Sequence, residues 1–230
     1  MTKEQFLEGQ VLLIDKPLHW TSFQVVNKLR WEIRKAFNIK KIKVGHAGTL
    51  DPLATGLLII CTGKMTKQIN TFQAQIKEYT GTIVLGSTTP SYDLETEIDN
   101  TFSTAHITEE LIQETTKQFI GEIAQFPPIF SAIKKDGKRL YEFARAGESV
   151  EIKSRQITIN TFEITQIALP EIDFRVVCSK GTYIRSLANN FGKALDSGGH
   201  LSILRRTKIG DFKVTDAFSV EKFIENLPSK

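Results

Sequence analysis

Apolar residues along this chain alternate with polar ones in some stretches and recur at helical spacing in others. Continuous or alternating apolar runs predict strands over residues 11–16, 56–61, 77–87, 156–167 and 172–179. Apolar residues three and four positions apart predict helices over residues 21–37, 66–72, 106–121, 184–195 and 220–227. The two kinds of element do not alternate strictly. We therefore expect an α+β fold with a mixed, mainly antiparallel central sheet flanked by helices and loops.

Local signals place several boundaries of these elements. Thr21 and Gln24 have the spacing of a capping box, and Thr108 precedes two glutamates as a helix N-cap does. Asp136-Gly137 is typical of a tight hairpin turn, and the acidic, polar residues 88–103 predict a surface loop. With no repeat or obvious linker, we expect one domain over residues 1–230.

One loop, residues 45–58, has an unusual mix of residues: GHAGTLDPLATGLL. Gly45, Gly48 and Gly56 permit backbone conformations closed to other residues, and the following proline forces Asp51 into an extended or turn conformation. An apolar run comes next, so we expect a rigid loop that presents one carboxylate and one imidazole at the edge of a core strand. The alternative is an ordinary polar turn, in which aspartate and glycine are common.

Composition narrows the class of protein. Of 230 residues, 40% are hydrophobic and 24% charged, as in ordinary globular proteins, and the net charge of +4 favours a polyanionic partner without establishing one. The two cysteines, Cys61 and Cys178, lie in apolar segments, so we expect a cytoplasmic protein with reduced thiols. The four histidines show no paired helical spacing, and no apolar run approaches membrane length. We therefore expect neither a metal site nor a membrane anchor.

Three groups of basic residues are candidates for contact with nucleic acid. The second group surrounds the Asp136-Gly137 turn and is interleaved with aromatic residues, a combination that suits RNA. Each group could equally be a solvated surface. The groups are Lys28, Arg30, Arg34, Lys35, Lys40, Lys41 and Lys43; Lys134, Lys135, Lys138 and Arg139; and Arg205, Arg206 and Lys208.

Arg185 falls in the first turn of the helix predicted after Lys180-Gly181. A cation at this position opposes the helix dipole, at a cost of a few tenths of a kcal/mol. We therefore expect Arg185 to have a carboxylate partner.

Five motifs, in order along the chain, resemble those of a single family. They are LLIDKPLHWTS, GHAGTLDPLATGLL, KEYTG, PPIFSAIKKDGKRLYEFARAG and VVCSKGTYIRSLANNFG. Together they resemble the TruB family of tRNA pseudouridine synthases, which isomerise uridine 55 in the T-loop of tRNA. The resemblance runs from about Val11 to Phe218 and implies the pseudouridine synthase fold.

The resemblance implies the catalytic groups. Asp51 is the implied nucleophile, Arg185 the partner that holds it as a carboxylate, and Tyr79 the residue that stacks on the target base and is a candidate proton relay. The reaction breaks the N1–C1′ bond, turns the base and rejoins it through C5, so it needs no redox step, cofactor or metal. A covalent adduct and a glycal route both remain open.

The resemblance also implies contacts with substrate. His46 matches the histidine that enters the space left by the extruded nucleotide, Tyr183 lines the pocket, and the backbone of Leu204 reads the uracil edge. A capped loop histidine and plain core packing are the alternatives for His46 and Leu204. The glycines of residues 45–58 would then give the backbone room to approach a flipped nucleotide. Residues 126–150 would form a mobile basic insertion that closes over the T-arm.

Two features depart from the family pattern. Longer members continue into a C-terminal RNA-binding module of the PUA type, and we expect no separate module of that kind here. The acidic loop TTPSYDLETEID lacks the glycine that commonly follows its aspartate. We expect a monomer that acts on tRNA. A non-catalytic RNA-binding or tRNA-folding protein on the same scaffold, and a synthase for another RNA, are the alternatives.

Overall fold

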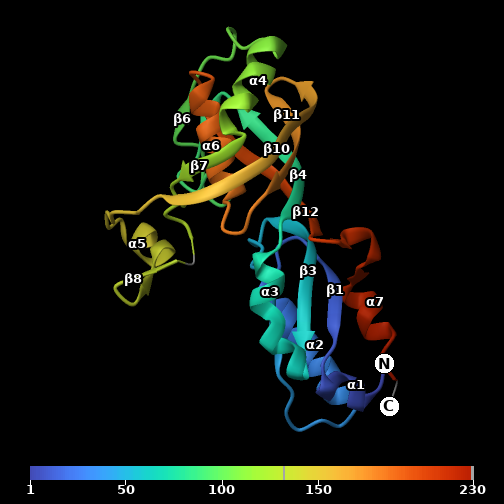
Figure 1. Ribbon diagram of the computed structural model, residues 1–230. Helices are drawn as coiled ribbons and strands as arrows, with labels where there is room; N and C mark the ends of the chain where they lie inside the picture. Colours follow the sequence, from blue (N-terminus) through green and yellow to red (C-terminus); the bar gives the residue numbers. More distant parts are fainter. Residues whose placement is uncertain (132, 229–230) are drawn as a thin grey trace. The chain divides into compact units, whose positions relative to one another are not determined.

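The computed structural model describes residues 1–131 and 133–228, and the chain forms two compact units. Unit 1 consists of Met1–Tyr79 with Leu204–Lys230, and unit 2 of Thr80–Ile203. The chain passes between the units within two strands, β4 (Lys77–Leu85) and β12 (Gly199–Ile209) (Figure 1). The expectation of one domain stays a prediction.

Unit 1 is built on a mixed sheet around one buried strand. The order is β14 (Phe218–Ser219), β1 (Val11–Lys16), β3 (Ala54–Thr62) and β12, with β2 (Val44–His46) paired to β3 and β13 (Phe212–Lys213) paired to β12. β3 pairs antiparallel with β1 and with β2, but parallel with β12. The predicted apolar strand is thus the centre of this sheet.

Helices cover both faces of the unit 1 sheet. Along β3, Leu58 and Ile60 pack into one apolar cluster with α2 (Ser22–Ala36) and α7 (Val220–Glu225), while Leu57 and Ile59 belong to a second cluster. This alternation with period two explains why the strand reads as a continuous apolar run. The capping box of Thr21 and Gln24 is confirmed at the start of α2. The remaining helices of this unit are α1 (Lys3–Glu8), η1 (Gly63–Gln68), α3 (Ile69–Ala74) and η3 (Val214–Asp216).

Unit 2 contains strands in the order β4, β11 (Glu171–Cys178), β10 (Arg155–Ala168) and β7 (Gly121–Gln125). Its helices are α4 (Glu109–Thr116), η2 (Lys117–Phe119), α5 (Leu140–Ala146) and α6 (Ile184–Ala194). The antiparallel pairs of β10 with β11 and β7, together with the mixed sheet of unit 1, confirm the predicted α+β class.

Two short ribbons complete unit 2. β5 (Ser87–Thr88) pairs with β6 (Asn100–Thr101), and β8 (Lys134–Lys135) pairs with β9 (Lys138–Arg139). Asp136 and Gly137 both have positive φ, 52° and 83°, which confirms the predicted hairpin turn. No helix within the described residues is long and apolar enough to cross a membrane.

Candidate functional site

Asp51 lies on the loop that connects β2 to β3, three residues before β3 begins. The backbone on both sides of it is fixed. The Ser22 hydroxyl accepts from the Leu50 N–H at 2.9 Å and donates to the Leu50 carbonyl at 3.2 Å, and the His19 N–H donates to the Pro52 carbonyl at 2.8 Å. The Asp51 carbonyl accepts from the Ala54 N–H at 3.0 Å. Hydrogen bonds to its backbone therefore hold the loop on both sides of Asp51, and the predicted presentation of the carboxylate stays a prediction.

A buried cation holds the same loop from β12. The Arg206 side chain is 1% exposed, and its guanidinium donates to the carbonyls of Leu57 at 2.8 Å, Gly48 at 3.1 Å and Thr49 at 3.4 Å. This burial contradicts the prediction that Arg206 contacts an RNA backbone. Its neighbour Arg205 points to the other face, as alternation in a strand requires.

The glycines of the loop serve the fold. Gly56 has a φ of +105°, and a Cβ there would lie 2.3 Å from the carbonyl oxygen of Arg206. At Gly45 a Cβ would lie 2.8 Å from Cδ1 of Ile69. The space at Gly56 is thus taken by the backbone of β12 rather than left open for a nucleotide, so that interpretation is wrong for Gly56. Gly56 permits close packing of β3 against β12.

Lys16 is a second buried cation near Asp51. Its side chain is fully buried, and its Nζ donates to the carbonyls of Pro17 at 2.9 Å and Trp20 at 2.6 Å. Burial lowers the pKa of Lys16 from its ordinary 10.5 to about 8, and the nearby Asp51 carboxylate opposes that shift. Our sequence interpretation missed this residue, although strand alternation places Lys16 on the same face as Leu12 and Ile14.

Three other predicted residues of the site lie in unit 1. Leu204 pairs in parallel register with Ala54, so it stands at the strand end that follows Asp51. Tyr79 and Leu204 are both buried, with 9% and 8% exposure. His46, at the end of β2, is half-buried, and burial lowers its pKa, which favours a neutral imidazole. Within the described chain its Nδ1 has no hydrogen-bond partner.

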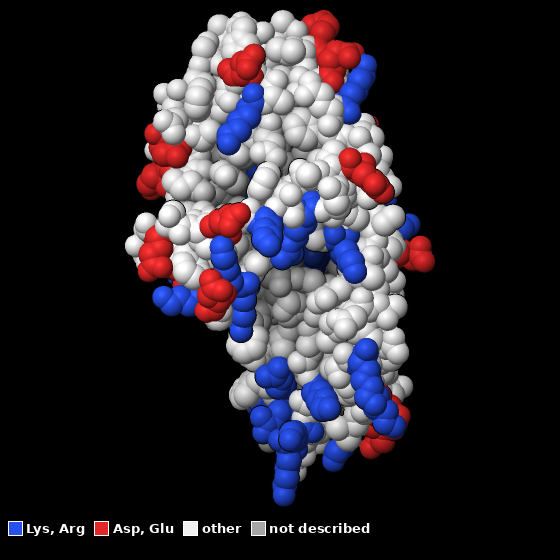
Figure 2. Space-filling view, turned by 60° about the vertical axis from the view of Figure 1, so that its left-hand side comes forward, with Lys and Arg blue, Asp and Glu red and all other residues white. Residues whose placement is uncertain are grey.

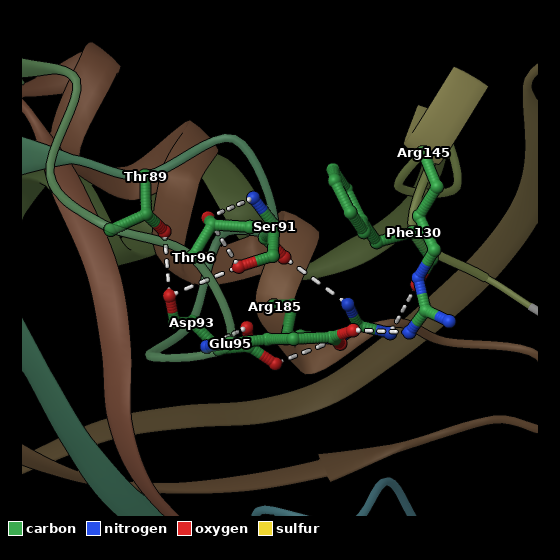
Figure 3. Close-up of polar contacts among 8 residues, drawn as sticks. All are labelled: Thr89, Ser91, Asp93, Glu95, Thr96, Phe130, Arg145 and Arg185. Atoms are coloured by element: carbon green, nitrogen blue, oxygen red, sulfur yellow. Dashed lines mark hydrogen bonds and ion pairs between the residues drawn. The ribbon is translucent and has the colours of Figure 1, made fainter. Parts of the chain in front are cut away.

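Arg185 lies in the first turn of α6, and its guanidinium is held from three directions (Figure 3). Nη1 donates to the Ser91 carbonyl at 3.1 Å, Nη2 donates to the Phe130 carbonyl at 2.9 Å, and Nε lies 3.5 Å from Oδ2 of Asp93. The side chains of this ion pair are 4% and 7% exposed. A carboxylate partner was predicted from the helix dipole, and Asp93 confirms it.

Asp93 was not recognised in the sequence, although it lies in the acidic loop of residues 88–103. Its Oδ1 accepts from the Glu95 N–H at 3.0 Å, and its carbonyl accepts from the hydroxyls of Thr89 at 2.7 Å and Ser91 at 3.1 Å. The loop is thus folded around this aspartate. The pairing of Arg185 with Asp51 would join residues of different units, and it stays a prediction.

Tyr183 precedes α6 as its N-cap residue. The side-chain amide of Gln125, 2% exposed at the end of β7, accepts from the Tyr183 N–H at 2.8 Å and donates to the Tyr183 carbonyl at 3.1 Å. The backbone of Tyr183 is therefore fixed to the sheet. The contact of the Tyr183 ring with substrate stays a prediction.

The basic residues of the insertion and of β12 have varied surroundings. Lys134, Lys138 and Arg139 are exposed at the β8–β9 hairpin, whereas Lys135 Nζ donates to the Glu151 carbonyl at 2.8 Å. Arg205 makes two hydrogen bonds with the Asp15 carboxylate, at 3.1 and 2.6 Å. Lys43 is exposed in unit 1. Their contact with RNA stays a prediction.

Among the described residues, no three histidine, cysteine, aspartate or glutamate side chains are grouped so that they could hold a metal ion.

The chain is similar to known proteins over nearly its whole length. A family model described as TruB family pseudouridylate synthase (N terminal domain) matches residues 34–184. The chain is 71% identical over 228 residues to the tRNA pseudouridine synthase B of Flavobacterium johnsoniae, which covers 99% of this chain and 100% of that protein. It is 60% identical over 220 residues to the tRNA pseudouridine synthase B of Phocaeicola vulgatus, covering 96% of this chain and 94% of the relative.

Two solved structures are similar in fold. One, described as a Cbf5-Nop10-Gar1 complex, contains a chain 30% identical with a TM-score of 0.72, covering 97% of this chain and 55% of that one. The other, an H/ACA RNP bound to a substrate RNA containing 2'-deoxyuridine, has a chain 28% identical with a TM-score of 0.68, covering 96% of this chain and 53% of that one.

Proposed function

Because this chain belongs to the TruB family of pseudouridylate synthases, we propose that it isomerises uridine to pseudouridine in tRNA, at position 55 of the T-loop. The observation that carries this proposal is the 71% identity to a tRNA pseudouridine synthase B over the full length of both chains. The reacting group in this proposal is the Asp51 carboxylate, which lies on the loop whose backbone Ser22 and Arg206 hold.

The target uridine has to leave the RNA stack before it can react, at a cost of a few kcal/mol. Contacts with phosphates and stacking on aromatic rings supply that free energy. In our proposal Tyr79 stacks on the extruded base, Tyr183 lines its pocket and the backbone of Leu204 reads the uracil edge. His46, with a lowered pKa, enters the vacated space as a neutral imidazole.

Asp51 then assists the chemical step. The N1–C1′ bond breaks while the carboxylate either bonds to the nucleotide or stabilises a glycal, the base turns, and C5 bonds to C1′. C5 loses its proton and N1 gains one, so the product is an isomer of the substrate, and Tyr79 is our candidate for the relay. The Lys16 ammonium, buried nearby, contributes positive potential at the carboxylate.

Arg185 has a positioning role in this proposal. Its contacts with Asp93, Ser91 and Phe130 fix the guanidinium before substrate arrives. A fixed guanidinium is suited to hold Asp51 as a carboxylate in the productive orientation.

We further propose a monomeric enzyme of the cytoplasm. Cys61 and Cys178 are buried and no disulfide joins them, which supports a reducing compartment. Analytical ultracentrifugation of the free protein and of its complex with tRNA would test the oligomeric state. A sedimentation coefficient of a dimer would contradict it.

The decisive test is a product assay with a T-arm stem-loop RNA. We expect the native protein to form pseudouridine at the target position, and no product when that uridine is replaced by cytidine. The Asp51→Asn variant is the matched control, because it keeps the size of the side chain and removes its negative charge. RNA binding without product from the native protein would favour a non-catalytic RNA-binding protein instead.

A further inference from the structure

A basic hollow lies in unit 1, on the side of β2 that faces α2 and η1. It has a volume of about 460 Å³. Figure 2 shows Lys and Arg side chains gathered in the lower part of the view. Five cations line the hollow, together with backbone and side chains of β2, η1 and α3: Arg30, Arg34, Lys40, Lys41 and Lys43.

In the part of the chain that the structure describes, the five cations of this hollow are not in ion pairs with carboxylates. Arg30 donates to the Val44 carbonyl at 3.1 Å and to the Asn27 side-chain oxygen at 3.0 Å, and Arg34 donates to the Ile39 carbonyl at 3.3 Å. Within the described residues, none of the ion pairs includes any of the five cations. By contrast, Lys28, which lies on α2 with Arg30 and Arg34, forms an ion pair with Glu32 at 2.9 Å. The hollow therefore carries a positive potential that suits an anion.

The segment that presents the lysines is anchored rather than loose. Ile42 and Val44 are buried in the core cluster of α2, so Lys41 and Lys43 between and beside them point outward. The Lys43 carbonyl accepts from the Gly63 N–H at 2.9 Å. Because the backbone of this segment is already fixed, binding an anion costs less conformational entropy than it would on a loose loop.

A second hollow adjoins the first and contributes an aromatic ring. It measures about 390 Å³ and shares Arg34 and Lys40 with the first hollow. Trp31 lines it and is 53% exposed, with the ammonium of Lys35 4.8 Å from the ring centroid. Cations beside an exposed indole are the combination that binds nucleic acid, through phosphates and stacked bases. A small inorganic anion would not use the ring.

The hollow lies at the end of β3 that is away from Asp51. Val44 pairs with Thr62 at one end of β3, while Asp51 precedes Ala54 at the other. Eight residue steps along a strand span about 26 Å at about 3.3 Å per residue. Stacked nucleotides in one strand advance about 3.4 Å each. A phosphate in the hollow therefore belongs to a nucleotide several positions from the target.

We propose that this basic hollow binds backbone phosphates of the tRNA substrate outside the T-arm hairpin that carries the target. The proposal rests on the proposed function, since it assigns a second contact region on the same RNA. The hollow adds affinity for the whole tRNA and takes no part in the chemical step.

The test compares two RNAs and two triple variants. Lys40→Ala, Lys41→Ala and Lys43→Ala together remove three exposed charges from the hollow. The control removes three exposed charges elsewhere, by Lys117→Ala, Lys193→Ala and Lys222→Ala. For each protein, Kd is measured against salt concentration with an isolated T-arm hairpin and with a whole tRNA, and pseudouridine formation is measured on both.

We expect the hollow variant to bind whole tRNA at least 10-fold more weakly than the control, with a salt slope reduced by about 2 to 3. Its Kd and turnover on the hairpin should match the control within about twofold. Equal Kd values and slopes for the two variants on whole tRNA would overturn the proposal. So would an equal loss on the hairpin, which would place the contact at the target arm. If the native protein bound both RNAs but made no pseudouridine, the proposed function would be wrong. The Kd values of the two variants would still test whether the hollow binds RNA phosphates.

Discussion

Two loops that carry aspartates are held in opposite ways. The loop of Asp51 is fixed through its backbone, by the Ser22 hydroxyl and by the buried Arg206 guanidinium, which donates to loop carbonyls. The loop of Asp93 is folded around the aspartate itself, whose carboxylate accepts from the Glu95 N–H and faces buried Arg185.

This difference separates a chemical role from a structural one. A loop fixed through its backbone can present its side chain to substrate, because hydrogen bonds from Ser22 and Arg206 hold the loop in place. A loop fixed by its carboxylate devotes the aspartate to the arginine beside it. We therefore expect Asp51 to tolerate substitution in terms of stability, and Asp93 not to tolerate it.

The largest expected effect on stability comes from Arg206→Met. It removes the donor of the buried Leu57 carbonyl in β3 and of the Gly48 and Thr49 carbonyls in the Asp51 loop, so we expect the free energy of unfolding to fall by about 3–5 kcal/mol. Urea denaturation gives the value. Arg205→Met is the control, because it breaks a partly exposed ion pair with Asp15 and should cost at most about 1 kcal/mol. Equal losses for the two variants would contradict the role assigned to Arg206.

Asp93→Asn comes next. It removes the carboxylate that lies 3.5 Å from Nε of the buried Arg185, and we expect a loss of about 3 kcal/mol in unfolding free energy, together with a lower rate of pseudouridine formation. Glu95→Gln is the matched control on the same loop, since its ion pair with Arg145 is exposed and should contribute less than about 1 kcal/mol. If Glu95→Gln were as damaging as Asp93→Asn, the loop would not be organised around Asp93.

Ser22→Ala tests the other support of the Asp51 loop. Both backbone groups of Leu50 lose their partner, which should cost about 1–2 kcal/mol in stability. We also expect a lower kcat, because Asp51 follows Leu50 directly. Thermal unfolding and a turnover assay measure the two effects, and an unchanged kcat would mean that the loop keeps its shape without Ser22.

The smallest effect concerns pH. The folded-state pKa of Lys16, about 8, lies below its unfolded value near 10.5, so between these values the unfolded chain binds more protons and stability rises with pH. This contribution should amount to about 1 kcal/mol between pH 7 and 9. Lys16→Met should lack it, since the variant has no group to deprotonate. Parallel stability curves for the native protein and Lys16→Met over this range would show that Lys16 keeps an ordinary pKa.

Local sequence signals predicted much of the fold. The capping box of α2 and the apolar run of β3 depend on residues within one turn or one strand, so they are legible without tertiary contacts. The positive φ pair at Asp136-Gly137 is equally local. The short helices α1 and α5 were not predicted, since six or seven residues carry too little periodicity to stand out.

The buried cations were missed for a physical reason. Lysine and arginine are rarely fully buried, so a basic residue is assigned to the surface by default. Residues 199–209 were not predicted as a strand, and only strand alternation shows that Leu204 and Arg206 share the buried face. For Lys16 the alternation was present in the predicted strand and was not used.

The partner of Arg185 illustrates the other limit. Its place in a helix indicated that a carboxylate was required, and a carboxylate is there. The identity of that carboxylate depends on a contact between residues 92 positions apart in sequence (185 − 93), which no local pattern encodes.

The most direct test of the division between the two loops is Asp51→Asn, studied in three measurements on one preparation. We predict a melting temperature within about 2 °C of the native protein, a Kd for tRNA within about twofold, and no detectable pseudouridine in a single-turnover assay. Product formed by Asp51→Asn at the native rate would contradict the catalytic role of this carboxylate, and a fall of 10 °C in melting temperature would contradict a loop held by its backbone.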